Sequence, residues 1–348
     1  MTDRIVLVTG GAGFLGEHVA RSLLASGSRV RVFDHAPSPA WAGLAGLEFI
    51  QGDVRDRAAL VRAAAGVSAI VHAAFASPRQ DASLITDVNL RGTENVSAAA
   101  AAHGVRRVVL VSSTVAGWAP RPHPFLRHSP LSRLDLYRAT RTEAEVMLAR
   151  SSPASFATAI VRPQSFLGPG RLGAFGIIFE LIRTGDPVPV LGTGAHRYQL
   201  LGVDDLAEGI RLLAATEHEG TFLFGANIFG TVNDDLTALL AHAGTNATLR
   251  HIPAALARPA LRAIELTGMV PLSEWHRHSA WGHDSVADTT RARLELGWRP
   301  ERSNIEALVN AYDWYVETVA RTGDAPRTHA VPRAHRMLRG LLSLLPHA

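Results

Sequence analysis

The stretch Arg4-Ile5-Val6-Leu7-Val8-Thr9-Gly10-Gly11-Ala12-Gly13-Phe14-Leu15-Gly16 decides the fold that this chain is expected to adopt. A β-branched apolar strand runs into a glycine-rich turn, and an amphipathic helix follows at once. Gly10 permits the tight turn, Gly13 lets the backbone approach phosphate groups, and Gly16 lets the helix pack closely on the strand. Because both the strand and the helix are present, this stretch predicts a site for the pyrophosphate of a dinucleotide.

An acidic residue stands where the second strand of such a unit should end. The run Arg29-Val30-Arg31-Val32-Phe33-Asp34 places a carboxylate about 20 residues after the glycine turn. Asp34 can accept both ribose hydroxyls of a dinucleotide and would repel a 2′-phosphate. Since no arginine follows Asp34 closely, NAD is favoured over NADP. An aspartate that only caps a turn is the weaker interpretation.

Length and composition limit the classes of protein that fit. The chain has 348 residues, 47% of them hydrophobic, enough for one large domain or for two lobes that share a cleft. No apolar run approaches the length of a membrane span, and no charged-then-apolar leader opens the chain. We therefore expect a cytoplasmic protein without membrane contact. The absence of cysteine excludes disulfides and thiolate metal sites.

The basic residues are unusual in kind. All 35 basic side chains are arginine, and the sequence contains no lysine. The formal net charge is only +4, and the arginines are scattered rather than clustered. No module with basic and interleaved aromatic residues is present, so the sequence predicts no nucleic-acid partner.

Apolar runs alternate with helical patterns along the first half of the chain. This order is typical of a parallel sheet with right-handed crossovers. Strands are expected at 4–9, 29–33, 47–51, 68–72, 106–112 and 156–161. Helices are expected at 14–26, 56–65, 81–103 and 135–150. The predicted fold class is α/β, with a Rossmann-type doubly wound sheet and a smaller C-terminal substrate lobe.

The domain boundaries follow from a change of composition. After Arg162-Pro163, glycine, proline and aromatic residues multiply, and Val203-Asp204-Asp205 then opens another helix. We expect an NAD-binding Rossmann domain at 1–162, to which 198–228 returns, a substrate-binding lobe at 163–197 and 229–320, and a basic, leucine-rich tail at 321–348.

Several further motifs appear in a fixed order, and together they resemble one family. They are Thr9 to Gly16, Gly52-Asp53-Val54-Arg55-Asp56, Val71-His72-Ala73-Ala74, Asn89-Leu90-Arg91-Gly92-Thr93 and Leu294-Glu295-Leu296-Gly297-Trp298-Arg299-Pro300. Over residues 4–318 the chain resembles an extended short-chain dehydrogenase/reductase of the NAD-dependent epimerase/dehydratase type. The resemblance implies a cofactor site formed by Gly10, Gly13, Phe14, Leu15, Gly16, Asp34, Asp53, Val54, Ala73, Ala74, Asn89, Tyr137, Arg141 and Pro163.

The resemblance also implies a catalytic set of a Ser or Thr, a Tyr and a Lys. The Tyr exchanges a proton with the substrate hydroxyl, the Ser orients that oxygen, and the Lys holds the nicotinamide ribose. Ser113 occupies the hydroxyl position, with Ser112 and Thr114 as near alternatives, and Tyr137 occupies the Tyr position.

Arg141 stands where this family has lysine. The spacing of four in Tyr137-Arg138-Ala139-Thr140-Arg141 places Tyr137 and Arg141 on one face of a helix. Arginine keeps its charge but does not easily release a proton, which would impair a proton relay through it. Either the process that removed every other lysine removed this one too, or the reaction needs no relay. The first explanation is favoured.

Three functions remain open from the sequence. The first moves hydride between NAD and a secondary alcohol or ketone, and the second is an NAD-retaining epimerase or dehydratase of a sugar or nucleotide sugar. The third is a non-redox lyase, cyclase or cofactor-binding protein, which Arg141 keeps open. Ser165 and Leu167 replace the Asn and Tyr usual in nucleotide-sugar enzymes, and the register of His196-Arg197-Tyr198-Gln199 is shifted by one. An aliphatic or polycyclic alcohol or ketone fits at least as well.

Two C-terminal segments carry less information. Residues 274–283 are rich in His and Trp but lack the carboxylate pairing of a metal site, so no metal is expected. The tail from Arg333 to Leu345 could lie on an acidic membrane surface, but docking on its own lobe or on a partner subunit is favoured. The family resemblance implies a homodimer formed through helices at 81–103 and 135–150.

Overall fold

The computed structural model describes residues 4–38, 41, 43–78, 80–114, 116, 133–172, 175–256, 259 and 282–322. Within these residues the chain forms two compact units. Unit 1 is drawn from Met1–Gln164, Val203–Phe224 and Asp288–Arg299, and unit 2 from Ser165–Gly202, Gly225–Ala287 and Pro300–Ala348. The tail segment 323–348 and residues 274–281 lie outside the described residues.

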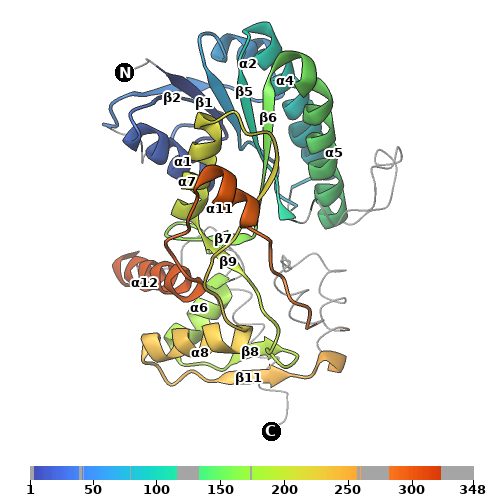
Figure 1. The fold of residues 1–348 in the computed structure, drawn as a ribbon. Coiled ribbons are helices and arrows are strands. Elements are labelled where there is room, and N and C mark those ends of the chain that lie inside the picture. Colours follow the sequence, from blue (N-terminus) through green and yellow to red (C-terminus); the bar gives the residue numbers. More distant parts are fainter. Residues whose placement is uncertain are drawn as a thin grey trace. The chain divides into compact units, whose positions relative to one another are not determined.

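Unit 1 is built on a seven-stranded sheet (Figure 1) in the order β10-β6-β5-β4-β1-β2-β3, and every strand pair in it is parallel. The strands are β1 (Ile5–Thr9), β2 (Arg29–Asp34), β3 (Leu47–Gln51), β4 (Ala69–His72), β5 (Arg107–Val111), β6 (Ala157–Pro163) and β10 (Gly220–Phe224). The strand order reverses beside β1, because β2 and β4 pair with its two edges. In sheets of this kind, ligands bind at the carboxyl ends of the strands flanking such a switch point.

Helices cover both faces of this sheet. They are α1 (Phe14–Ala25), α2 (Arg57–Ala63), α3 (Ala82–Thr86), the π-helical η2 (Asp87–Arg91), α4 (Gly92–Ala102), α5 (Arg133–Ser155), α7 (Val203–Ala215) and α11 (Thr290–Leu296). Helix α1 packs on α7, whereas α4 packs on both α2 and α5. Alternate strand residues such as Leu7, Ile70 and Val108 join the core under α2, α4 and α5. The predicted Rossmann-type doubly wound sheet is confirmed.

One expected helix contains a distortion that matters for the site. The expected strands agree with the observed ones to within about two residues, but the helix expected at 81–103 consists of α3, η2 and α4. The π-helical turn is centred on Asn89, which is fully buried. Single π-turns inside α-helices are frequent at functional sites.

Two arginines hold the carboxyl end of α7. The Nε of Arg107 donates to the Leu213 carbonyl at 2.9 Å, and its Nη2 donates to the His218 carbonyl. Arg4 donates to the Ala214 carbonyl. Cations near a helix C-terminus satisfy free carbonyls and complement the helix dipole. Burial lowers the pKa of Arg107 to about 10, which still leaves it charged at neutral pH.

Unit 2 has its own core. It contains the parallel pair β7 (Ser165–Leu167) and β9 (Leu200–Gly202), the parallel pair β8 (Val188–Leu191) and β11 (Leu249–Ile252), and the helices α6 (Phe175–Thr184), α8 (Val232–Ala243) and α12 (Asn304–Thr322). In this core Phe179 contacts Tyr312 edge-to-face and Tyr315 at a tilt. The Tyr315 hydroxyl donates to Glu180, whose carboxylate also accepts from Arg183.

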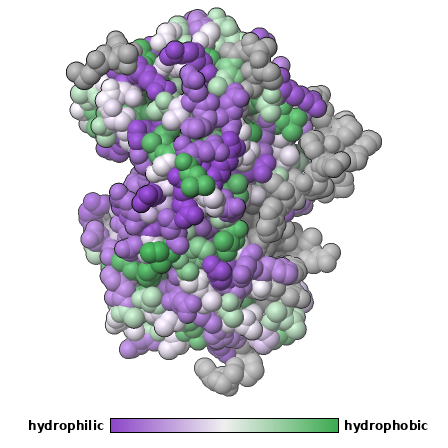
Figure 2. Space-filling model, viewed as in Figure 1, coloured by the Kyte–Doolittle hydropathy of each residue, from purple (hydrophilic) through white to green (hydrophobic). Residues whose placement is uncertain are grey.

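The surface is mixed in character. Figure 2 shows hydrophobic residues in small groups among hydrophilic ones on the face in view. Ile228 and Leu294 are the most exposed of the large apolar side chains described. Among the described residues, no helix has the length and apolar character needed to cross a bilayer.

Candidate active site

The glycine-rich turn between β1 and α1 leaves no space for a side chain at two of its glycines. Gly10 has a φ of +71°, and a Cβ there would lie 2.7 Å from the backbone of Ala74. A Cβ on Gly16 would lie 2.2 Å from the Gly10 carbonyl oxygen. Glycine is therefore required at both positions. Helix α1 begins directly after this turn, with Gly13 as its N-cap, so its first N–H groups can receive an anion.

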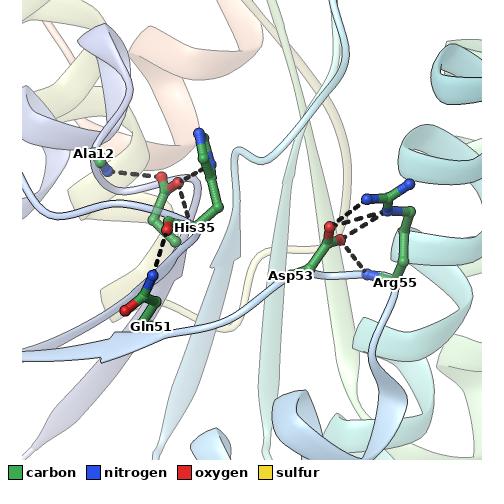
Figure 3. Close-up of polar contacts among 6 residues, drawn as sticks. Ala12, His35, Gln51, Asp53 and Arg55 are labelled. Carbon is green, nitrogen blue, oxygen red and sulfur yellow. Dashed lines mark hydrogen bonds and ion pairs between the residues drawn. The ribbon is translucent and has the colours of Figure 1, made fainter.

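Asp34 is fixed beside this turn at the end of β2. Its Oδ2 accepts the Ala12 N–H at 2.9 Å, and its Oδ1 accepts the His35 N–H at 2.7 Å. Figure 3 shows Ala12 and the exposed ring of His35 on either side of this carboxylate, the ring nitrogen 2.6 Å from Oδ1. Asp34 is buried, and its Oδ2, which accepts the Ala12 N–H, has a further lone pair for a ribose hydroxyl.

Asp53 is held by an arginine two residues further on. Its Oδ1 accepts the Arg55 backbone N–H at 2.9 Å, and its Oδ2 accepts the Arg55 Nη2 at 2.6 Å (Figure 3). The hydrogen bonds from Arg55 hold the pKa of Asp53 below its usual range. The sequence motif predicted Asp53 and Val54 as cofactor residues but gave Arg55 no role. An Asp-x-Arg spacing is the signal that could have identified this pair.

Asn89 connects the loop after β4 to the helix that carries Tyr137. Its Oδ1 accepts the Ala76 N–H at 2.9 Å, and its Nδ2 donates to the Thr140 hydroxyl at 3.0 Å. The Thr140 hydroxyl in turn donates to the Tyr137 carbonyl at 3.0 Å. Asn89 therefore fixes α5 against the loop that borders the glycine turn.

Tyr137 and Arg141 meet on α5 as their spacing predicts. The Arg141 Nη2 donates to the Tyr137 hydroxyl oxygen at 2.8 Å, and its Nη1 donates to the Val111 carbonyl at 2.6 Å. Arg141 is buried, whereas Tyr137 is partly exposed. A permanent cation thus donates a hydrogen bond to the phenolic oxygen.

The three candidate hydroxyl residues follow β5. Ser112 is buried and its backbone N–H donates to the Val161 carbonyl at 2.7 Å. The Thr114 hydroxyl donates to the Pro163 carbonyl at 3.3 Å, while Ser113 is partly exposed. The structure therefore places all three at the carboxyl end of the sheet, the edge where the glycine turn and Asp34 also lie.

His72 is a buried residue whose role the sequence did not reveal. Its Nδ1 lies 2.7 Å from the Thr9 hydroxyl, and its Nε2 lies 3.2 Å from the Thr93 hydroxyl. Because Thr93 donates its proton to the Asn89 carbonyl at 2.6 Å, it must accept from Nε2, and Thr9 must donate to Nδ1. This directed chain of hydrogen bonds joins β1, β4 and α4. A histidine in an otherwise apolar strand was the available signal.

The expected substrate lobe residues lie in unit 2. The Ser165 and Tyr198 hydroxyls are 2.7 Å apart. Gln199 is buried and spans the backbone, donating to the Ala226 carbonyl and accepting from the Ala287 N–H, both at 2.7 Å. The exposed Arg197 guanidinium stacks on Phe229, 4.7 Å from the ring centroid. Within the described ranges, no group of three His, Asp or Glu residues could hold a metal ion.

A model of the NAD dependent epimerase/dehydratase family matches residues 6–225. The match begins in β1 and includes the glycine turn, Asp34, Asn89 and the Tyr137–Arg141 pair. It therefore spans the residues of unit 1 described above and more than half of the chain.

Relatives and solved structures agree with this match. Protein y4nG of Sinorhizobium fredii is 31% identical over 348 residues, covering 99% of this chain and 86% of that protein. The 3 beta-hydroxysteroid dehydrogenase/Delta 5→4-isomerase of Mycobacterium tuberculosis is 33% identical over 229 residues, 60% of each chain. The crystal structure of the Bordetella bronchiseptica enzyme WbmG in complex with NAD has the same fold, with a TM-score of 0.68, 21% identity, and coverage of 91% of this chain and 95% of that one.

Proposed function

Because the chain belongs to the NAD-dependent epimerase/dehydratase family, we propose that it moves hydride between NAD and a secondary alcohol or ketone of a small molecule. In this proposal Tyr137 is the acid and base, and Ser113 orients the substrate oxygen. The observation that carries it is the 2.8 Å hydrogen bond from Arg141 to the Tyr137 hydroxyl. A base that must hold and release a proton benefits from a fixed cation on its oxygen.

The residues present fit NAD. The glycine turn would hold the pyrophosphate at the start of α1, because side chains are excluded there. Asp34 would accept from the adenosine ribose, and Asp53 with Val54 would border the adenine. Ala73, Ala74 and Pro163 would line the nicotinamide side. When bound, NAD supplies a nicotinamide ring that accepts or returns a hydride.

Arg141 would act differently from a lysine at the same place. In the oxidation direction the Tyr137 phenolate accepts the hydroxyl proton of the alcohol, and in the reduction direction the phenol returns it to the carbonyl oxygen. Arg141 stays protonated in both directions, so it stabilises the phenolate without passing on a proton. The proton then leaves Tyr137 by way of solvent, which the partial exposure of its side chain allows.

The proposed substrate is an aliphatic or polycyclic alcohol or ketone. Ser165 and Leu167 depart from the nucleotide-sugar pattern, and the buried Gln199 is occupied by backbone groups of unit 2. The similarity to the mycobacterial 3 beta-hydroxysteroid dehydrogenase supports a secondary alcohol on a polycyclic skeleton as the first class to test.

The test is NADH formation by purified protein supplied with NAD and a panel of aliphatic and polycyclic secondary alcohols. We expect NADH to accumulate with at least one member, and Tyr137→Phe to lower kcat by about 100-fold or more. Arg141→Lys should retain activity. Conversion of a sugar without free NADH would favour the epimerase or dehydratase alternative. Turnover that survives Tyr137→Phe would overturn both redox functions.

A further inference from the structure

Phe75, in the loop after β4, lies against the guanidinium group of Arg141. The Arg141 Cζ is 3.6 Å from the centroid of the Phe75 ring, so the two planar groups are in face contact. Phe75 is itself partly buried and packs on the core of unit 1. The ring of His72 lies 4.9 Å from the same phenyl ring and supports it from the strand side.

This stack determines where the Arg141 donors point. Its two Nη atoms donate to the Val111 carbonyl and the Tyr137 hydroxyl, whereas its Nε is buried without a hydrogen-bond partner among the described residues. Two donors leave the guanidinium plane free to tilt about the line that joins them. An aromatic face against that plane removes the remaining freedom, and a stacked cation on an aromatic ring is favourable.

We propose that Phe75 is a positioning residue, which holds the Arg141 guanidinium so that its Nη2 points at the Tyr137 oxygen. The inference rests on the proposed acid and base role of Tyr137. Phe75 and Arg141 act as one unit in place of lysine, because a lysine ammonium has no planar face to stack and no fork of parallel donors. The titratable groups that the described contacts place against Arg141 are Tyr137 on α5 and His72 on β4.

The test follows the ionisation of Tyr137 directly, in protein labelled with carbon-13 at the tyrosine ζ position. The chain has only four tyrosines, and Tyr137→Phe assigns the resonance. Burial raises the pKa values of Tyr312 and Tyr315. In Phe75→Leu we expect the Tyr137 resonance to titrate at a higher pH than in the wild type, because the Arg141 donor is no longer held on the phenolic oxygen. Phe75→Tyr, which keeps the ring, should restore the wild-type midpoint.

A second arm separates positioning from general loss of structure. In an Arg141→Lys background, Phe75→Leu should leave the Tyr137 midpoint unchanged, because the coupled partner is already gone. In the active enzyme the acid limb of the pH profile of kcat should shift in the same direction as the Tyr137 titration midpoint. The KM for NAD should change by less than about twofold. Phe75→Met, also without a flat face, replaces Phe75→Leu if that variant does not fold.

An unchanged Tyr137 midpoint in Phe75→Leu would overturn the inference, and so would an equal shift in the Arg141→Lys background. These measurements need no substrate. If the alcohol panel yields no NADH but the midpoint shifts as expected, the proposed reaction fails while the positioning of Arg141 by Phe75 stands.

Discussion

Acid should destabilise unit 1 through one residue, His72. Burial, together with a smaller effect of the nearby Arg141 cation, lowers the pKa of this histidine from 6.5 to about 3. The folded protein therefore keeps His72 neutral, whereas the unfolded chain takes up a proton there below about pH 6.5. The free energy of unfolding is unaffected by His72 above that pH and falls as the pH drops toward 3.

The magnitude follows from the two pKa values. Linkage gives a loss of about 3 kcal/mol between about pH 7 and pH 4, and about 5 kcal/mol once the pH is below 3. This loss is a large fraction of the free energy of unfolding of a typical protein, which is about 5–15 kcal/mol. Other groups also respond to acid, Asp53 among them, so the effect of His72 has to be isolated by comparison.

The assay is urea unfolding of the wild type and of His72→Gln at about pH 7 and about pH 4, followed by circular dichroism. The His72→Gln protein should be less stable than the wild type at neutral pH, because it lacks the ring that bonds to both Thr9 and Thr93. Its further loss on acidification should be smaller than that of the wild type by about 3 kcal/mol. His103→Gln removes an exposed histidine at the end of α4 and should behave as the wild type does.

Identical pH dependence of the wild type and His72→Gln would refute the reasoning. A His72 ring that titrates near 6.5 in the folded protein, measured by carbon-13 NMR, would refute it as well. Either result would mean that the ring is solvated or that its bonds to the two threonine hydroxyls do not persist.

Three further predictions concern the cofactor turn and the arginine cap. Gly10→Ala should weaken NAD binding by about tenfold or more in calorimetry, since the added Cβ would lie 2.7 Å from backbone atoms. Gly27→Ala is the matched control, because Gly27 also has a positive φ but no atom lies near its Cβ position. This variant should bind NAD normally. Asp34→Asn should lower NAD affinity by roughly tenfold and reduce the preference for NAD over NADP, measured as the ratio of the two dissociation constants. An unchanged ratio would show that Asp34 does not select the cofactor. Arg107→Met should cost about 3 kcal/mol of unfolding free energy, because the Leu213 carbonyl at the end of α7 and the His218 carbonyl after it both lose a charged donor. The exposed Arg106→Met should cost under about 0.5 kcal/mol.

Local patterns accounted for much of the fold. The alternation of apolar strands and helical segments predicted six parallel strands with nearly correct bounds, because burial on both faces leaves continuous β-branched runs in the sequence. The π-turn at Asn89 is implied by the family motif but not by helix propensity, which does not record that the Asn89 side chain bonds to Ala76 and Thr140. Those partners come from other parts of the chain.

The candidate site also has features that local sequence predicts and features that depend on contacts between distant residues. The sequence by itself determined the glycine turn, Asp34 at the end of β2 and the Tyr137–Arg141 pair, because each depends on spacing within one element or one turn. Only the tertiary structure decided that the Arg141 guanidinium stacks on Phe75, and that His72 joins hydroxyl groups from β1 and α4. Thr9 and His72 lie 63 positions apart, and such contacts arise from the packing of strands and helices rather than from any periodicity in the sequence.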